Sequence, residues 1–292
     1  MPASQRLLLV HAHPDDETIN NGATMAKYAA AGAQVTLVTC TAGEEGEVLV
    51  EDLAHVASAH EDRLGEVRQQ ELAAAMAELG VSDHRFLGGF GRFRDSGMIG
   101  TEPNARPDCF WQSDLLVCAT ELVKVIREVR PQVMVTYDDF GGYGHPDHIQ
   151  AHRVAMYALA LAAAPSFQPE LGAAWEISKV YWSAMPKNLM KSAVEALRAQ
   201  GVDNDFTRAD LDQMPFLCDD ALITTRVEAG DFVDAKTRAL RAHATQIDFE
   251  SGFFKLVSEL PGGNFGIEHY RLVKGNAAPA ADGIETDLFA GL

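Results

Sequence analysis

Two aspartates and two histidines follow a short aliphatic run near the N-terminus, in the stretch VHAHPDDE at residues 10–17. His13 and Asp16 lie three residues apart across a proline, and imidazole nitrogen and carboxylate oxygen are common zinc ligands. Asp15, between them, could act as a general base toward a water molecule at such a metal. The alternative is a capped turn, in which Asp15 or Asp16 caps the helix that follows. This segment alone supports both interpretations equally.

The same His-Pro-Asp unit recurs in GYGHPDH, with one more histidine after it. Catalytic zinc usually has three protein ligands and one open position, so either His145 or His148 would complete a His/Asp/His set. The other histidine could serve as an acid or an electrostatic donor. Asp147 could hold a histidine through its second ring nitrogen, and Tyr143 could donate a hydrogen bond to an oxyanion. Taken singly, either histidine is more often an ordinary polar loop residue.

Hydrophobic strands and amphipathic helices alternate through the first 165 residues and must position these two segments. Strands are expected at residues 6–12, 34–40, 84–88 and 131–137, and helices at 21–32, 61–80, 113–130 and 149–163. Strands connected through helices predict an α/β fold with a mostly parallel sheet and helices on both faces. Ligands bind at the carboxyl ends of such strands, and each His/Asp cluster directly follows a strand. The two clusters together therefore predict a mononuclear metal site.

The second half of the chain is less regular. Strands are expected at residues 175–185 and 221–229, and helices at 186–201 and 231–246. No linker or repeat separates the halves. We therefore expect one domain, with the metal-binding core at residues 1–165 and a C-terminal portion at residues 166–292.

The composition restricts the possible partners. The formal net charge of −18 disfavours nucleic acid and an anionic membrane surface. No apolar run is long enough to cross a membrane, and the N-terminus is too polar for a signal peptide, so a cytoplasmic protein is expected. The four cysteines form no CxxC pair, and we expect them to be reduced. Oligomeric state cannot be predicted.

Other motifs are weaker. GFGRFRDSG lacks the strand–helix context of a dinucleotide loop, and no GxSxG is present. Arg68 and Glu71 have the i, i+3 spacing of a surface ion pair, and His243 is expected to be structural. The long Gly- and Pro-rich loop at residues 89–109 is of the kind that covers a substrate.

The strand–HPDDE segment, TCTAGEEGEV at residues 39–48 and the Tyr-x-His-Pro-Asp-His motif resemble the LmbE/PIG-L family of zinc-dependent de-N-acetylases. The resemblance implies a Rossmann-like fold whose C-terminal portion completes the substrate side. It also implies a role for each matching residue: metal ligands His13, Asp16 and His148, general base Asp15, oxyanion donor Tyr143, assisting acid or stabiliser His145, orienting carboxylate Asp147, and substrate contacts Arg68 and Asp95. Under these roles Arg68 becomes a substrate contact rather than half of an ion pair.

Further stretches, FLGGFGRFRDSGM, VTYDDFGGYGHPDH and TDLFAGL, resemble the branch of this family that acts in mycothiol biosynthesis. The implied reaction converts N-acetylglucosaminyl-inositol to glucosaminyl-inositol and acetate. The alternative is a mycothiol S-conjugate amidase, whose corresponding loop tends to carry a lysine that residues 18–21 lack. The implied cofactor is one Zn²⁺ per chain, although Fe²⁺ also suits this ligand set. Either Asp15 or His145 could protonate the leaving amine.

Overall fold

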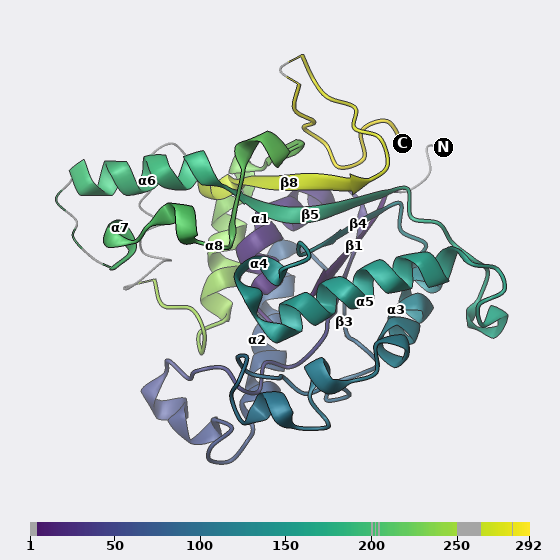
Figure 1. Cartoon of the computed structure of the whole chain (residues 1–292), viewed down its shortest axis with the longest axis horizontal. Coiled ribbons are helices and arrows are strands. Elements are labelled where there is room, and N and C mark those ends of the chain that lie inside the picture. The colour runs from purple at the N-terminus through teal and green to yellow at the C-terminus, as the bar shows by residue number, and fades with distance from the viewer. Residues whose placement is uncertain (1–4, 200, 202, 204, 250–263, 282) are drawn as a thin grey trace.

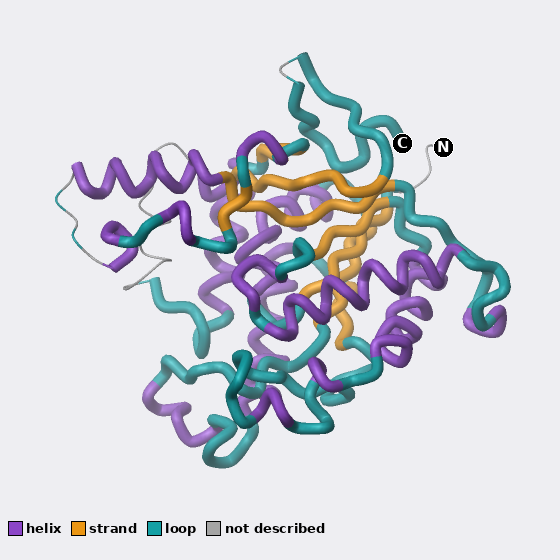
Figure 2. Tube along the Cα trace, in the orientation of Figure 1, coloured by secondary structure: helices purple, strands orange, loops and turns teal. Residues whose placement is uncertain are grey.

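A central β-sheet, orange in Figure 2, organises the chain in the computed structural model. The structure describes residues 5–199, 201, 203, 205–249, 264–281 and 283–292. Within these residues the sheet has eight strands in the order β3-β2-β1-β4-β5-β8-β7, and β6 pairs with β5 beside this path. The bounds are β1 Arg6–His11, β2 Gln34–Thr39, β3 Asp83–Phe86, β4 Val133–Thr136, β5 Lys179–Pro186, β6 Leu217–Cys218, β7 Thr225–Glu228 and β8 Ile267–Lys274.

The first five strands confirm the predicted Rossmann-like α/β fold. Each neighbouring pair among β3, β2, β1, β4 and β5 is parallel, and this order is that of dinucleotide-type doubly wound sheets. The chain leaves β1 toward β2 on one side and later places β4 on the other. This reversal puts a crevice between the carboxyl ends of β1 and β4, where ligands bind in such sheets.

Helices cover both faces of the sheet (Figure 1). One face carries α1 Asp16–Ala30, α2 Leu64–Leu79 and α8 Val233–Ala242, and the other carries α3 Leu115–Val129 and α5 Pro146–Ala163. Alternate side chains of β1 point to opposite faces of the sheet. Leu7 and Leu9 pack against the first group of helices, and Leu8 and Val10 pack against the second. All four side chains are fully buried. Each contributes roughly 1.5–3 kcal/mol, so β1 is fixed firmly at the centre.

Shorter helices lie in the connections. The remaining α-helices are α4 Gly141–Gly144, α6 Lys187–Ala199 and α7 Asp205–Arg208. The 3₁₀ helices are Glu51–Val56, Pro103–Ala105, Phe110–Gln112, Pro169–Leu171, Leu211–Gln213, Asp220–Leu222, Gly230–Phe232 and Asn264–Gly266. α3 is capped by Asp114, whose side chain accepts a hydrogen bond from Val117 N at 3.0 Å.

The second half of the chain extends the sheet. β5 is parallel to β4, whereas β8 runs antiparallel to both β5 and β7. β8 is not predicted by the sequence pattern, since its residues IEHYRLVK mix charged and apolar side chains. α8 packs against α1 and α2, and its residues share their hydrophobic cluster. The division into residues 1–165 and 166–292 stays a prediction.

A buried carboxylate ties the C-terminal segment to this part of the sheet. Glu285 is fully buried and accepts hydrogen bonds from Lys179 Nζ at 2.5 Å, Tyr181 Oη at 2.6 Å and Thr225 Oγ1 at 3.0 Å. Burial raises the pKa of the Glu285 carboxyl, but the hydrogen bonds from Lys179 and Tyr181 outweigh it and hold that pKa below its usual value. The segment therefore depends on a charged Glu285.

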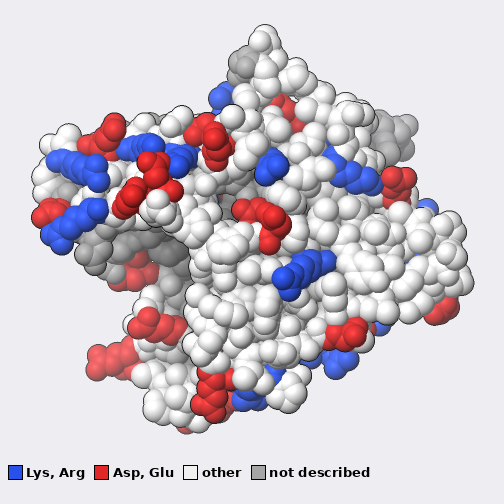
Figure 3. Space-filling view, in the orientation of Figure 1, with Lys and Arg blue, Asp and Glu red and all other residues white. Residues whose placement is uncertain are grey.

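Charged side chains of both signs share the surface, whereas a smaller set that includes Glu285 and Lys179 is buried. Figure 3 shows acidic and basic side chains interspersed on one face, and on α6 both Lys187 and Lys191 pair with Asp212, at 2.7 and 3.1 Å. All four cysteines lie in the described part and are free, as expected. Among the described residues, no helix is both long and apolar enough to cross a membrane.

Candidate active site

Three donor atoms from the two sequence clusters meet at the crevice between β1 and β4. His13 Nδ1 lies 3.4 Å from Asp16 Oδ2 and 3.2 Å from His148 Nε2, and these last two atoms are 3.4 Å apart. Ligands that stand about 2.0–2.2 Å from a tetrahedral zinc are separated from one another by roughly 3.3–3.6 Å. The triangle therefore has the dimensions and the donor chemistry that a metal of this type requires.

The fold explains why these atoms meet. His13 and Asp16 follow β1, and His148 lies in the first turn of α5, which begins ten residues after β4 ends. The ring of His148 is oriented by its Nδ1 atom, which lies 3.1 Å from the carbonyl oxygen of Gly141 and leaves Nε2 facing His13. Gly141 has φ 66°, and a side chain there would approach His148 Cβ to 2.6 Å. Only glycine lets this loop lie so close to the histidine.

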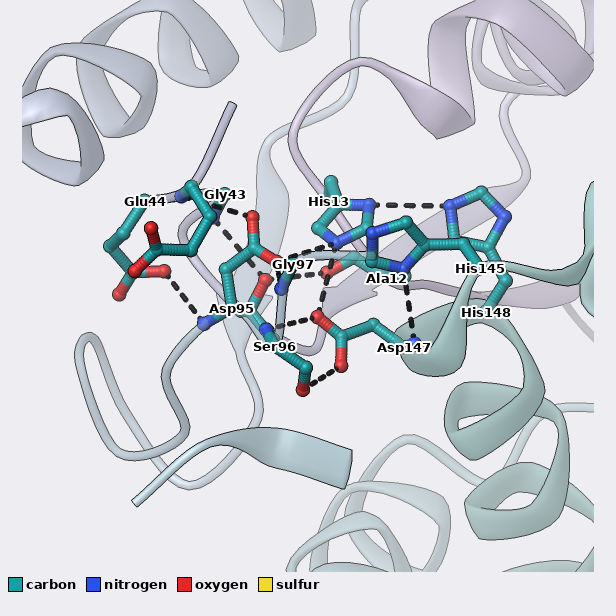
Figure 4. Close-up of polar contacts among 12 residues, drawn as sticks. Ala12, His13, Gly43, Glu44, Asp95, Ser96, Gly97, His145, Asp147 and His148 are labelled. Carbon is teal, nitrogen blue, oxygen red and sulfur yellow. Dashed lines mark hydrogen bonds and ion pairs between the residues drawn. The ribbon is translucent and has the colours of Figure 1, made fainter. Parts of the chain in front are cut away.

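A second carboxylate fixes the orientation of His13 (Figure 4). Asp147 Oδ2 lies 3.2 Å from His13 Nε2, so Nε2 carries the proton and Nδ1 presents its lone pair to the triangle. Asp147 is itself held by Ser96, whose backbone N donates to Oδ2 at 2.9 Å and whose hydroxyl donates to Oδ1. Asp147, expected to orient a histidine, thus contacts His13, and the long loop supplies its anchor.

Asp95, which the family resemblance predicts to contact substrate, is buried beside His13 and Asp147. Its Oδ1 atom lies 3.6 Å from His13 Nε2 and accepts a hydrogen bond from Gly97 N at 2.8 Å. Its Oδ2 atom accepts a hydrogen bond from Glu45 N at 3.2 Å. Asp95 therefore joins two loops and at the same time lines the cavity.

Asp15 does not act as a helix cap. It occupies the N-cap position of α1 with φ 124°, but its side chain makes no capping bond, and the Oδ2 atom of Asp16 accepts from His13 N at 2.9 Å instead. The capped-turn interpretation is therefore wrong for both aspartates. Asp15 Oδ2 lies 3.1 Å from Arg68 Nη2. Burial raises the pKa of Asp15 to about 6, although the Arg68 guanidinium opposes this rise. A carboxylate with such a pKa is suited to act as a base near neutral pH.

Two further polar side chains face the same space. Tyr143 is 49% exposed, yet partial desolvation of its hydroxyl and the nearby charge of Asp16 keep its pKa above the ordinary value, so the hydroxyl remains a donor. The Nδ1 atom of His145 accepts a hydrogen bond from Asp147 N at 3.1 Å, which leaves the proton on Nε2. Burial, assisted by the neighbouring His13 and His148, lowers the pKa of His145 to about 3. His145 is therefore neutral and presents an N–H donor.

A cavity of about 850 Å³ opens onto these groups. Asp15, Tyr143 and His145 line it, and the C-terminal portion contributes lining residues that include Trp182, Phe216 and Arg271. This volume lies within the range of small-molecule sites. The C-terminal portion thus forms one side of the cavity.

Arg68 is placed differently from a surface ion pair. It is 3% exposed, and its guanidinium donates to Gly43 O at 2.9 Å and Pro14 O at 2.6 Å. Glu71 instead accepts hydrogen bonds from the backbone N and the hydroxyl of Thr245. The ion-pair interpretation is wrong, because segments distant in sequence cover this face of α2.

Two residues of the site were not singled out from the sequence. Ser96 anchors Asp147, and Tyr137 stacks on the ring of His148 with centroids 4.4 Å apart while its hydroxyl accepts from Ala12 N at 2.8 Å. Both act through contacts between distant segments. Only the arrangement of VTYDDFGGYGHPDH and RDSGM as short polar stretches near the predicted strand ends could have indicated them.

Comparisons with known proteins agree with this geometry. Residues 8–159 match the family model described as PIG-L: GlcNAc-PI de-N-acetylase. The chain is 59% identical over 297 residues to a Kribbella flavida protein named 1D-myo-inositol 2-acetamido-2-deoxy-alpha-D-glucopyranoside deacetylase, covering 99% of this chain and 98% of that protein. A Nocardioides protein of the same name is 57% identical, with both chains fully covered. Among solved structures, N,N'-diacetylchitobiose deacetylase from Pyrococcus horikoshii has the same fold, with TM-score 0.63, 19% identity and coverage of 96% and 89% of the two chains.

Proposed function

Because the chain belongs to the PIG-L family, we propose that it is a metal-dependent deacetylase that hydrolyses the N-acetyl amide of N-acetylglucosaminyl-inositol to glucosaminyl-inositol and acetate. The observation that carries the proposal is the triangle of donor atoms on His13, Asp16 and His148, with the uncapped carboxylate of Asp15 beside it. The shared name of the two bacterial relatives supports the choice of substrate.

The proposed cofactor is one Zn²⁺ per chain, held by His13 Nδ1, Asp16 Oδ2 and His148 Nε2. Two imidazoles and one carboxylate suit zinc, and they also suit Fe²⁺. When bound, the ion would polarise the acetyl carbonyl and lower the pKa of a water molecule. Asp147 and Ser96 support the site by holding His13 in the tautomer that presents Nδ1.

Asp15 is the proposed general base. Its carboxylate lines the cavity, is not used for capping and has a pKa raised to about 6 by burial. It would take the proton of the attacking water as the new C–O bond forms. The Arg68 guanidinium keeps this carboxylate charged and in place through the contact at 3.1 Å.

Tyr143 and His145 are the proposed partners of the reacting amide. The Tyr143 hydroxyl would donate a hydrogen bond to the amide oxygen as negative charge develops there. When the C–N bond breaks, the amine would leave with the proton that Asp15 took from the water, because the lowered pKa of His145 keeps that ring neutral and suits it to donate a hydrogen bond instead. Arg68 and Asp95 line the same cavity and are the proposed contacts for substrate hydroxyl groups.

A mycothiol S-conjugate amidase is the second candidate, and the size and lining of the cavity favour keeping it. Besides its polar residues, the cavity has an apolar part lined by Met185, Met190 and Phe216. This apolar surface could accommodate an acyl group bulkier than acetyl. Residues 18–21 lack the lysine that the amidase branch tends to carry, which favours the deacetylase.

The proposal also includes a role in mycothiol biosynthesis and a cytoplasmic location.

The test is to load the protein with zinc and measure turnover of N-acetylglucosaminyl-inositol and of a mycothiol S-conjugate under the same conditions. A higher kcat/KM for release of acetate from the first compound supports the deacetylase. A higher kcat/KM for the conjugate would assign the amidase, and turnover of neither would contradict the proposed function.

A further inference from the structure

A buried acid–histidine pair lies directly behind Asp15. Glu17 and His243 are both fully buried, and Glu17 Oε1 lies 3.2 Å from His243 Nε2. The same oxygen accepts a hydrogen bond from Thr18 Oγ1 at 2.6 Å. The second oxygen, Oε2, accepts a hydrogen bond from the backbone N of Asp15 at 3.1 Å. Glu17 thus joins a histidine at the end of α8 to the main chain of the proposed base.

The backbone of Asp15 needs such support. Its φ of 124° is far from the conformations that non-glycine residues favour. Such a conformation persists only where the surroundings fix it, and it is found preferentially at functional sites. Here it turns the side chain away from the helix terminus, where an N-cap aspartate would normally bond, and toward Arg68.

The carboxylate, the carbonyl oxygen and the N–H group of Asp15 are each held by a different partner. Arg68 holds the carboxylate, and Ile19 N donates to the carbonyl oxygen of Asp15 at 2.9 Å as the first bond of α1. The N–H group points the other way and is accepted by Glu17. His243, 226 residues away in sequence, fixes the carboxylate that does this.

We propose that Glu17, anchored by His243, is a positioning residue that holds Asp15 in its positive-φ conformation and so directs the Asp15 carboxylate at the attacking water. The inference rests on the proposed role of Asp15 as general base. The C-terminal portion would then support catalysis as well as line the cavity. His243, at the end of α8, contacts Glu17, and Glu17 in turn contacts the backbone of Asp15. A displacement of about 1 Å at such a group can lower a rate on the order of a hundredfold.

The test compares two variants of the full-length protein that both remove the charge of Glu17. Glu17→Gln keeps an oxygen that can accept the Asp15 N–H. The double variant Glu17→Met/His243→Leu has no acceptor, and it should fold because apolar residues commonly replace a buried ion pair without loss of stability. Glu71→Gln is the matched control, since Glu71 anchors Thr245, two residues from His243, without touching Asp15. For each protein, kcat, KM and zinc per chain are measured, and the crystal structure is solved.

We expect kcat of the double variant to fall on the order of tenfold to a hundredfold, with KM and zinc content as in the wild type. Glu17→Gln and Glu71→Gln should keep kcat within a few-fold of the wild type. A double variant with wild-type kcat, or a Glu17→Gln variant as impaired as the double variant, would overturn the inference.

The crystal structures separate this inference from the proposed function. If the wild type releases no acetate, the proposed function fails, and the backbone of residue 15 still decides the role of Glu17. We expect φ of Asp15 to stay positive in Glu17→Gln and to leave that region in the double variant. An unchanged φ in the double variant would contradict the role of Glu17.

Discussion

The carboxylate of Asp15 lies 3.1 Å from the guanidinium of Arg68, and both side chains are largely buried where they line the cavity. Burial disfavours the charged form of Asp15 and raises its pKa. The positive charge of Arg68 opposes this effect, so that the pKa of Asp15 is raised only to about 6. The pair therefore sets the pH range in which Asp15 can act as a base.

The pH profile tests this relationship. Because the base must be deprotonated, kcat/KM should rise with pH through an acidic limb at or below about pH 6, since a bound cation lowers the pKa of Asp15 further. Arg68→Gln removes the opposing charge, raises the pKa of Asp15 and should move the limb to higher pH by about one pH unit or more. Arg63→Gln, which changes an exposed arginine on the turn before α2, is the control. Identical limbs in all three proteins would contradict the coupling.

Ser96→Ala should weaken metal binding. The change removes the hydroxyl that donates to Asp147 Oδ1, so that Asp147 holds His13 less firmly. Loss of such an outer contact typically costs about 10–100-fold in metal affinity or activity, and we expect this loss in the zinc dissociation constant measured by chelator competition. Ser113→Ala, which removes a hydroxyl that donates to Cys109 O at 2.9 Å and not to Asp147, should bind zinc normally. Equal affinity of both variants would remove Ser96 from the site.

Tyr143→Phe should lower kcat with little change in KM. The phenyl ring would still pack near His148, but the hydroxyl that donates to the developing oxyanion would be lost. Removing one such donor typically lowers turnover by about a hundredfold or more. Steady-state kinetics of Tyr143→Phe and of Tyr157→Phe, at a tyrosine outside the cavity, measure the effect. Unchanged kcat in Tyr143→Phe would exclude this hydroxyl from the mechanism.

Glu285→Gln should destabilise the fold and change its pH dependence. The pKa of Glu285 is held below its unfolded value, so its contribution is fully present above that unfolded value of 4.5 and is lost as pH falls through the folded pKa. Glu285→Gln leaves Lys179 buried without its partner, which costs about 3 kcal/mol. Urea denaturation at pH 7 and at lower pH should show this difference at pH 7 and a smaller one in acid. Glu176→Gln, in an exposed pair with Lys274, should have little effect at either pH.

Much of the fold could be predicted from the sequence, because β1 to β4 are short apolar runs separated by amphipathic helices. Each run lies close to its expected position, and their order follows from the alternation of strands and helices. β8 could not be predicted in the same way. Its strand mixes polar and apolar residues, and its place between β5 and β7 depends on antiparallel pairing between segments far apart in the chain.

In the candidate site, too, some residues could be predicted from local motifs and others could not. His13, Asp15, Asp16 and His148 lie in two local motifs that directly follow strands, so strand geometry alone brings them together. Ser96 and the Glu17–His243 pair depend on contacts across 51 and 226 residues, which no local pattern encodes. His243 was expected to be structural, and its burial agrees with that expectation, but its partner contacts the main chain of Asp15.

Zinc content and acetate release from N-acetylglucosaminyl-inositol, measured for the wild type, Asp15→Asn and Asp16→Asn, separate the metal ligand from the general base. We expect Asp15→Asn to keep its zinc and to lose about 10²–10⁴-fold in turnover, the usual contribution of a general base. Asp16→Asn should bind zinc more weakly and lose turnover with it. If Asp15→Asn loses its zinc while Asp16→Asn retains it, or if Asp15→Asn turns over as fast as the wild type, the assignment of ligand and base is wrong.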